Sequence, residues 1–121
     1  MHVRYVVLYV TDVEACRRFW VEQVGMVEKH RVEVEGHAVV QVGFAAQAFA
    51  FELVPLALMA DNPDGLDLAT PSIALHVDDL EAARAQLVER GVTAMEIGEH
   101  GGVTSFAFSD NEGRWFAVTT G

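Results

Sequence analysis

The pattern of apolar and polar positions predicts the same order of strands and helices twice along the chain. The segments "VVLYVTDVEACRRFWVEQVG", residues 6–25, and "SIALHVDDLEAARAQLVERG", residues 72–91, each open with an apolar run of strand length. Apolar residues at helical spacing follow in each segment, and a glycine is expected to end the helix. The residues that recur at equivalent places include Leu8 and Leu75, Asp12 and Asp79, and Glu14 and Glu81.

The start of each predicted helix carries a capping signal. Thr11 precedes Glu14 by three residues, and Asp78 precedes Glu81 by the same spacing. An oxygen side chain followed three residues later by glutamate is the pattern of a capping box. We therefore expect Thr11 and Asp78 to cap the starts of these helices.

Three shorter apolar stretches follow each predicted helix and are separated by turn residues. In the first half they cover residues 26–34, 37–43 and 48–54, and in the second half residues 92–98, 103–109 and 114–120. The pattern predicts a β-α-β-β-β module used twice within one α+β domain, residues 1–121. Module one covers about residues 1–54, a turn-rich connector residues 55–70, and module two about residues 71–121.

Side chains alternate across a strand, so the first and last strands of each module each have two faces. One face is apolar and suits packing beneath a helix, as with Leu8 and Val10 in the first strand. The other face mixes aromatic, small and polar groups, which is typical of a ligand cavity. The residues that we expect to line such a cavity are Tyr5, Tyr9, Glu52, Ser72, His76 and Trp115.

Glu52 is the candidate catalytic residue. It lies in mid-strand between Phe51 and Leu53, where an unpaired charge would be costly to bury. A structural interpretation gives it a hydrogen bond to Tyr5, Ser72 or another neighbour. A functional interpretation makes it a ligand-binding group or a general base.

Charge and cysteine content narrow the classes of partner. The formal net charge is −10, with 8 basic residues and no basic cluster, which argues against a nucleic-acid partner. The same charge would repel an anionic membrane surface, and no apolar run reaches the roughly 20 residues of a membrane helix. The N-terminal segment reads as a strand and not as a signal peptide. A single cysteine, Cys16, suits the reducing cytoplasm, where we expect the protein to reside.

Two segments resemble a known family. "LYVTDVEACRRFWVEQVGM" is similar to the opening strand and helix of the vicinal oxygen chelate superfamily, and "FSDNEGRWFAV" is similar to its closing hairpin. This superfamily includes glyoxalase I, bleomycin resistance proteins and extradiol dioxygenases. The resemblance implies paired βαβββ modules whose curved mixed sheets enclose a cavity. It also implies a homodimer, because relatives often complete their cavity from two chains.

The resemblance also identifies the positions that hold a divalent metal in glyoxalase-like members. They fall on Tyr5, Glu52, Ser72 and Ala117. Only Glu52 is a suitable ligand, because alanine has no donor, neutral serine is a poor one and a tyrosine phenol has a pKa of about 10. We therefore expect no metal cofactor. If a metal does bind, His76 is the best substitute ligand.

These observations favour a protein that binds a small organic ligand without a metal, sequestering a drug-like or cationic aromatic compound. One alternative is a glyoxalase-like lyase or isomerase, or a dioxygenase, that uses Glu52 with a non-standard metal site or as a general base. Another is a non-catalytic interaction module.

Overall fold

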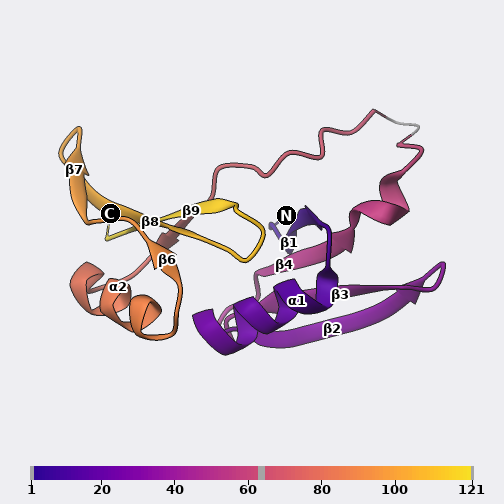
Figure 1. The fold of residues 1–121 in the computed structure, drawn as a ribbon, viewed down its shortest axis with the longest axis horizontal. Helices are drawn as coiled ribbons and strands as arrows, with labels where there is room; N and C mark the ends of the chain where they lie inside the picture. Colours follow the sequence, from indigo (N-terminus) through magenta and orange to yellow (C-terminus); the bar gives the residue numbers. More distant parts are fainter. Residues whose placement is uncertain (1, 63–64, 121) are drawn as a thin grey trace. The chain divides into compact units, whose positions relative to one another are not determined.

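The computed structural model describes residues 2–62 and 65–120. The chain divides into two compact units, residues 1–70 and residues 71–121. Each unit combines one sheet with helical structure that follows its first strand (Figure 1). The predicted β-α-β-β-β order is present in both units, with one strand of the second unit split in two. The α+β fold class predicted from the sequence is therefore confirmed.

The first unit contains a four-stranded mixed sheet. Its strand order is β1-β4-β3-β2, with β1 parallel to β4 and the other neighbours antiparallel. The helix α1 continues directly into a π-helical segment. The elements are β1 (Tyr5–Val10), α1 (Val13–Arg18), the π-helix (Phe19–Val24), β2 (Val27–Val34), β3 (His37–Gly43), β4 (Ala50–Pro55) and a 3-10 turn (Leu56–Met59).

The residue that caps each helix lies one position later than the sequence pattern predicted. Asp12 has an extended backbone, with φ −129° and ψ 101°, and its carboxylate accepts the N–H of Ala15 at 3.0 Å. Asp79 caps the second helix in the same way, accepting the N–H of Ala82 at 3.0 Å. A side-chain cap must come from the last extended residue, and both aspartates meet that requirement. The predicted caps, Thr11 and Asp78, are therefore wrong by one position.

The core of the first unit lies between the helical segment and one face of the sheet. Leu8 and Val10 are buried, as the alternation predicted for the first strand. Trp20 is fully buried and packs edge-on against Phe51, with ring centroids 5.1 Å apart. Gly25 ends the helical segment in the left-handed conformation, with φ 101°, as predicted.

The second unit has a five-stranded sheet of order β5-β9-β8-β6, with β7 also paired to β8. The first strand is parallel to the last, which repeats the arrangement in the first unit. Phe108 and Phe116 stack in its core, with centroids 5.7 Å apart. Its elements are β5 (Ala74–His76), α2 (Leu80–Glu89), β6 (Thr93–Ala94), β7 (Gly98–His100), β8 (Val103–Ser109) and β9 (Trp115–Thr119).

The stretch predicted as one strand over residues 92–98 is interrupted. It forms the short β6 and is followed, after a break, by β7. At the break the Arg84 guanidinium of α2 donates hydrogen bonds to the carbonyl oxygens of Met95, at 2.7 Å, and Ala94, at 3.4 Å. These bonds hold the segment against the helix. Among residues 2–62 and 65–120, no helix has the length and apolar character needed to cross a membrane.

Candidate functional site

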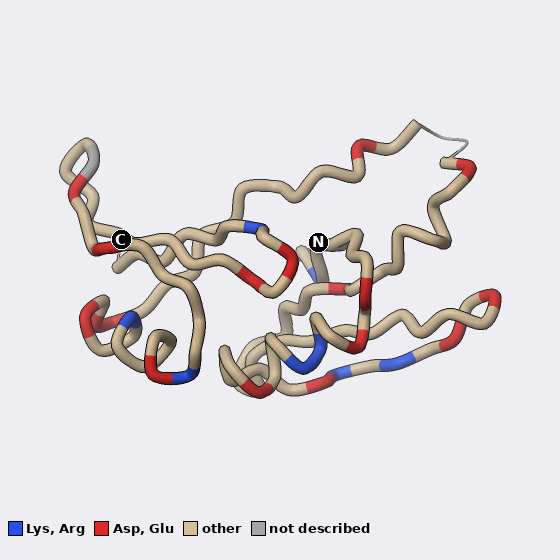
Figure 2. The backbone as a smooth tube through the Cα atoms, in the orientation of Figure 1, with Lys and Arg blue, Asp and Glu red and all other residues tan. Residues whose placement is uncertain are grey.

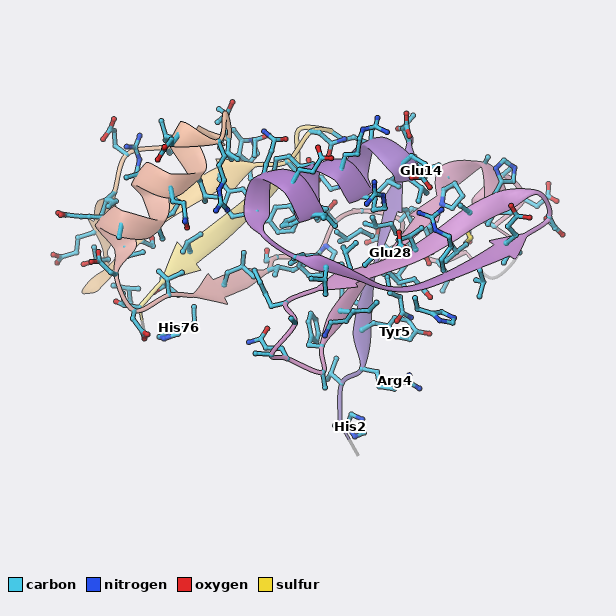
Figure 3. The ribbon with its side chains drawn as sticks, turned by 90° about the horizontal axis from the view of Figure 1, so that it is seen from below. His2, Arg4, Tyr5, Glu14, Glu28 and His76 are labelled. Atoms are coloured by element: carbon cyan, nitrogen blue, oxygen red, sulfur yellow. The ribbon has the colours of Figure 1, made fainter. Side chains whose placement is uncertain are left out.

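The sheet face of the first unit that lies opposite the core holds three of the predicted ligand-binding residues. Tyr5 and Tyr9 come from β1, and Glu52 comes from β4. Tyr5 is 42% exposed, and Figure 3 shows it at the N-terminal end of β1, close to Arg4. In the parallel register Val7 is the partner of Glu52, so the two tyrosines flank the row that contains this carboxylate. We call this surface the open face of the first sheet.

Glu52 has a neighbour that sequence reasoning did not identify. Gln41 of β3 is its direct partner in the antiparallel register, and the Gln41 Nε2 donates to Glu52 Oε1 at 3.2 Å. Both side chains are half-buried. The predicted structural role for Glu52 allowed a hydrogen bond to Tyr5, Ser72 or another neighbour, and the partner is this glutamine. No local pattern could have indicated it, because the pairing of β3 with β4 is set by the register between distant segments.

The corresponding face of the second sheet holds the other predicted residues. His76 of β5 is exposed, and its Nε2 lies 3.3 Å from Asp78 Oδ1. Trp115 of β9 is 47% exposed, and Ser72 is exposed just before β5. Small residues lie between them in the register, where Ala117 pairs with Ala74 on one side and Ala107 on the other. This surface therefore presents the indole ring of Trp115, the imidazole of His76 and the methyl groups of the alanines between them.

The four positions that correspond to metal ligands in the resembled family do not supply a ligand set here. In the first sheet Glu52 of β4 pairs with Val7 of β1, and in the second sheet Ala117 of β9 pairs with Ala74 of β5 at the equivalent place. The place that Glu52 holds in the first sheet is therefore held in the second sheet by Ala117, whose methyl group cannot bind a metal. Among residues 2–62 and 65–120, no three His, Cys, Asp or Glu side chains gather into a group that could hold a metal ion. Of the four positions, only Glu52 carries a side chain that is a good donor for a divalent metal.

The densest group of charges in the first unit lies away from the open face. Arg31 of β2 binds Glu14 at 2.6 Å and Glu28 at 2.8 Å, and Arg17 of α1 lies 3.3 Å from Glu14. Figure 3 shows Glu14 on α1 and Glu28 on β2, and Figure 2 shows basic residues along both elements. We call these four residues the α1–β2 ion network. It ties the helix to the edge strand.

The network also shifts the pKa values of its acidic members. Hydrogen bonding to Arg31 is the main cause that lowers the pKa of Glu14, and Arg17 adds to the effect while partial burial opposes it. The pKa of Glu28 is lowered for the same principal reason. The pKa of Arg31 is raised in return, first by its hydrogen bond to Glu28 and then by that to Glu14. These groups are paired with one another, so they are poor candidates for ligand recognition.

Comparison with known families identifies the class of protein. Residues 2–118 match the family described as the "Glyoxalase/Bleomycin resistance protein/Dioxygenase superfamily". The match covers nearly the whole chain. The chain therefore belongs to this superfamily, as its two βαβββ units and the resemblance of its sequence motifs indicated.

Several solved structures share the fold at low sequence identity. UcmS2 has a TM-score of 0.82 and 20% identity, and the match covers 100% of this chain and 98% of that one. A member of the glyoxalase/bleomycin resistance protein/dioxygenase superfamily from Sphaerobacter thermophilus DSM 20745 has a TM-score of 0.82 and 22% identity, with coverage of 98% and 96%. TnmS3, described as an antibiotic binding protein from Streptomyces sp. CB03234, has a TM-score of 0.79 and 24% identity, with coverage of 98% and 94%. No curated protein matches the chain closely.

Proposed function

We propose that the protein binds a small organic molecule, of the drug-like or cationic aromatic class, without using a metal ion. The observation that carries this proposal is the position of Glu52. Its half-buried carboxylate lies on the open face of the first sheet, in a register row flanked by Tyr5 and Tyr9. Aromatic rings beside a carboxylate suit a planar ligand that carries positive charge.

Two further points support a binding role. TnmS3, which shares the fold over 98% of this chain, is described as an antibiotic binding protein. The positions equivalent to a metal site carry a phenol, one carboxylate, a hydroxyl and a methyl group, in Tyr5, Glu52, Ser72 and Ala117. Chemistry at a divalent metal would require three or four good donors. Binding a ligand through aromatic stacking and charge requires no such metal donors.

Metal content is the first test of this function. Protein purified without chelator is dialysed against zinc, nickel, manganese or iron and then analysed by mass spectrometry. We expect less than about one tenth of an equivalent of any metal. A stoichiometric metal that disappears in Glu52→Ala would instead favour the glyoxalase-like or dioxygenase alternative.

Ligand binding is the second test. A panel of planar aromatic compounds is screened by calorimetry, with Tyr5→Ala and Glu52→Gln, both on the open face of the first sheet, as variants. The two changes remove a stacking surface and a charge, so each should weaken a bound ligand about tenfold. Replacement of Val88, which is exposed on α2, by alanine serves as the control. Unchanged affinity in both site variants would place the site elsewhere.

The proposal includes a homodimer in the cytoplasm. Cys16 is buried and is the single cysteine of the chain, so it can form no disulfide within the chain, which fits a reducing compartment. Sedimentation equilibrium across protein concentrations from about 1 to 100 μM gives the oligomeric state directly. A mass that remains that of one chain throughout would rule out the dimer.

A further inference from the structure

Among the residues that the structure describes, the open face of the first sheet contains one carboxylate, and no basic side chain forms an ion pair with it. The residues on this face come from alternating positions of its four strands, and Glu52 is the acidic one among them. No ion pair joins its carboxylate to a cation within the described parts of the chain. A negative charge that is half-buried without a counter-charge attracts a cation more strongly than one in open water.

Gln41 is the one described side chain that donates a hydrogen bond to this carboxylate. The 3.2 Å bond uses Glu52 Oε1 and one N–H of the amide. It leaves Glu52 Oε2 and the side-chain amide oxygen of Gln41, Oε1, without a donor among residues 2–62 and 65–120. These two acceptors belong to residues that are partners in the β3–β4 register, so they lie on neighbouring strands of one face. A group with two N–H donors matches such a pair.

We propose that Gln41 is a positioning residue, which holds the Glu52 carboxylate so that the pair selects a ligand carrying a protonated amine or amidinium on an aromatic ring system. This inference rests on the proposed binding function and specifies the ligand class. The Gln41 amide fixes the rotamer of Glu52 through Oε1. The cationic group of the ligand then donates hydrogen bonds to Glu52 Oε2 and Gln41 Oε1, while the ligand ring lies against Tyr5 or Tyr9.

The pair has an alternative explanation as a purely structural contact. A cross-strand hydrogen bond of this kind stabilises a sheet slightly wherever it occurs. The two explanations differ in one measurable respect. A structural contact changes stability alone, whereas a positioning contact changes the preference of the site for cations over anions of the same shape.

The test therefore uses two planar probes of opposite charge, proflavine as the cation and anthraquinone-2-sulfonate as the anion. The dissociation constant of each probe is measured by fluorescence and calorimetry. The proteins compared are the full chain, Gln41→Leu, Glu52→Gln and the exchange variant Gln41→Glu with Glu52→Gln. Gln86→Leu, at an exposed position of α2, is the matched control. Thermal unfolding of every variant confirms that it is folded.

We expect the full chain to bind proflavine at least about tenfold more tightly than the anion, as a charge-assisted hydrogen bond would provide. Gln41→Leu should reduce this preference about fivefold and Glu52→Gln should abolish it, while Gln86→Leu leaves it intact. The exchange variant should recover part of the preference, because it returns a carboxylate beside an amide.

Two outcomes would overturn this inference while leaving the binding function in place. One is a full chain that binds both probes with equal affinity. The other is a cation preference that Gln41→Leu does not change. A protein that binds neither probe nor any aromatic compound in the panel would overturn the proposed function as well, so the two failures are distinguishable.

Discussion

Asp110 and Arg114 close the turn between β8 and β9 through both their backbones and their side chains. The Asp110 N–H donates to the Arg114 carbonyl at 2.8 Å, and the Arg114 N–H donates to Asp110 Oδ1 at 2.8 Å. Asp110 Oδ2 lies 3.2 Å from the guanidinium, and the aspartate side chain is 1% exposed. Burial alone would lower the pKa of Arg114, but the attraction of Asp110 and hydrogen bonds to Glu112 and Asp110 raise it overall.

Removing this carboxylate should destabilise the second unit strongly. Asp110→Ala removes one of the two carboxylates that pair with the Arg114 guanidinium and leaves the N–H groups of Glu112 and Arg114 without their Asp110 acceptor. We therefore expect a loss of about 3 kcal/mol in the free energy of unfolding. Asp110→Asn keeps one acceptor oxygen and should lose less. Urea denaturation at neutral pH measures both values. Equal losses in the two variants would show that the retained acceptor oxygen contributes nothing and that the loss comes from the missing charge.

Gly43 should not tolerate a larger side chain. A Cβ at this position would lie 2.5 Å from the Phe49 carbonyl oxygen and 3.3 Å from the Ala50 Cα, and neither backbone atom can move freely. We expect Gly43→Ala to cost about 2–3 kcal/mol. Gly36→Ala is the control, because its Cβ meets nothing within 4 Å and its cost, about 1 kcal/mol, arises from the positive φ alone. Equal costs in denaturant melts would indicate that the Phe49 backbone shifts easily.

Trp20 should be the most sensitive core residue of the first unit. It is fully buried, with its ring 5.2 Å from that of Phe19 and 5.1 Å from that of Phe51. Trp20→Ala should cost about 3–5 kcal/mol, because it removes a large apolar surface and leaves a cavity. Trp20→Phe should cost less. Chemical denaturation followed by circular dichroism compares the variants, and a loss under about 1 kcal/mol for alanine would mean that the neighbours collapse into the space.

The α1–β2 ion network should make stability depend on acid pH. The folded-state pKa values of Glu14 and Glu28 are lowered, chiefly by hydrogen bonds to Arg31. Lowered values stabilise the folded protein above the ordinary glutamate pKa, about 4.3, and the stabilisation is lost as the pH falls through the lowered values. Melting temperatures measured from pH 7 to pH 2.5 should therefore fall less steeply in Arg31→Met than in the original chain. Since the network is partly exposed, high salt should weaken the difference.

The architecture was largely predictable from the sequence, because the signals that define it are local. Alternation placed Leu8 and Val10 in the core, and helical spacing together with Gly25 bounded the first helical segment. The start of that segment was missed by one residue. Thr11 and Asp12 are both good capping residues, and only the backbone conformation determines which of them caps.

The candidate site was predicted less completely. The strand pattern placed Tyr5, Tyr9 and Glu52 on one face, and the structure agrees. Gln41 was missed because an amide in a strand has no distinctive spacing. Its proposed role comes from lying opposite Glu52 in the register, and that pairing depends on the lengths of the turn and strands between them. The role of these residues in ligand binding stays a prediction until the experiments above are done.

The parallel pairing of β1 with β4 has a consequence for how the chain folds as it is synthesised. Tyr5 is the register partner of Ala50, and the same offset holds along the whole strand. In this sheet β1 therefore has no neighbour until β4 has been synthesised. In the meantime its apolar residues, and those of the helix that follows, are exposed to other chains and to chaperones. The second unit repeats this arrangement in β5 and β9, so each synthesis passes through two such intervals.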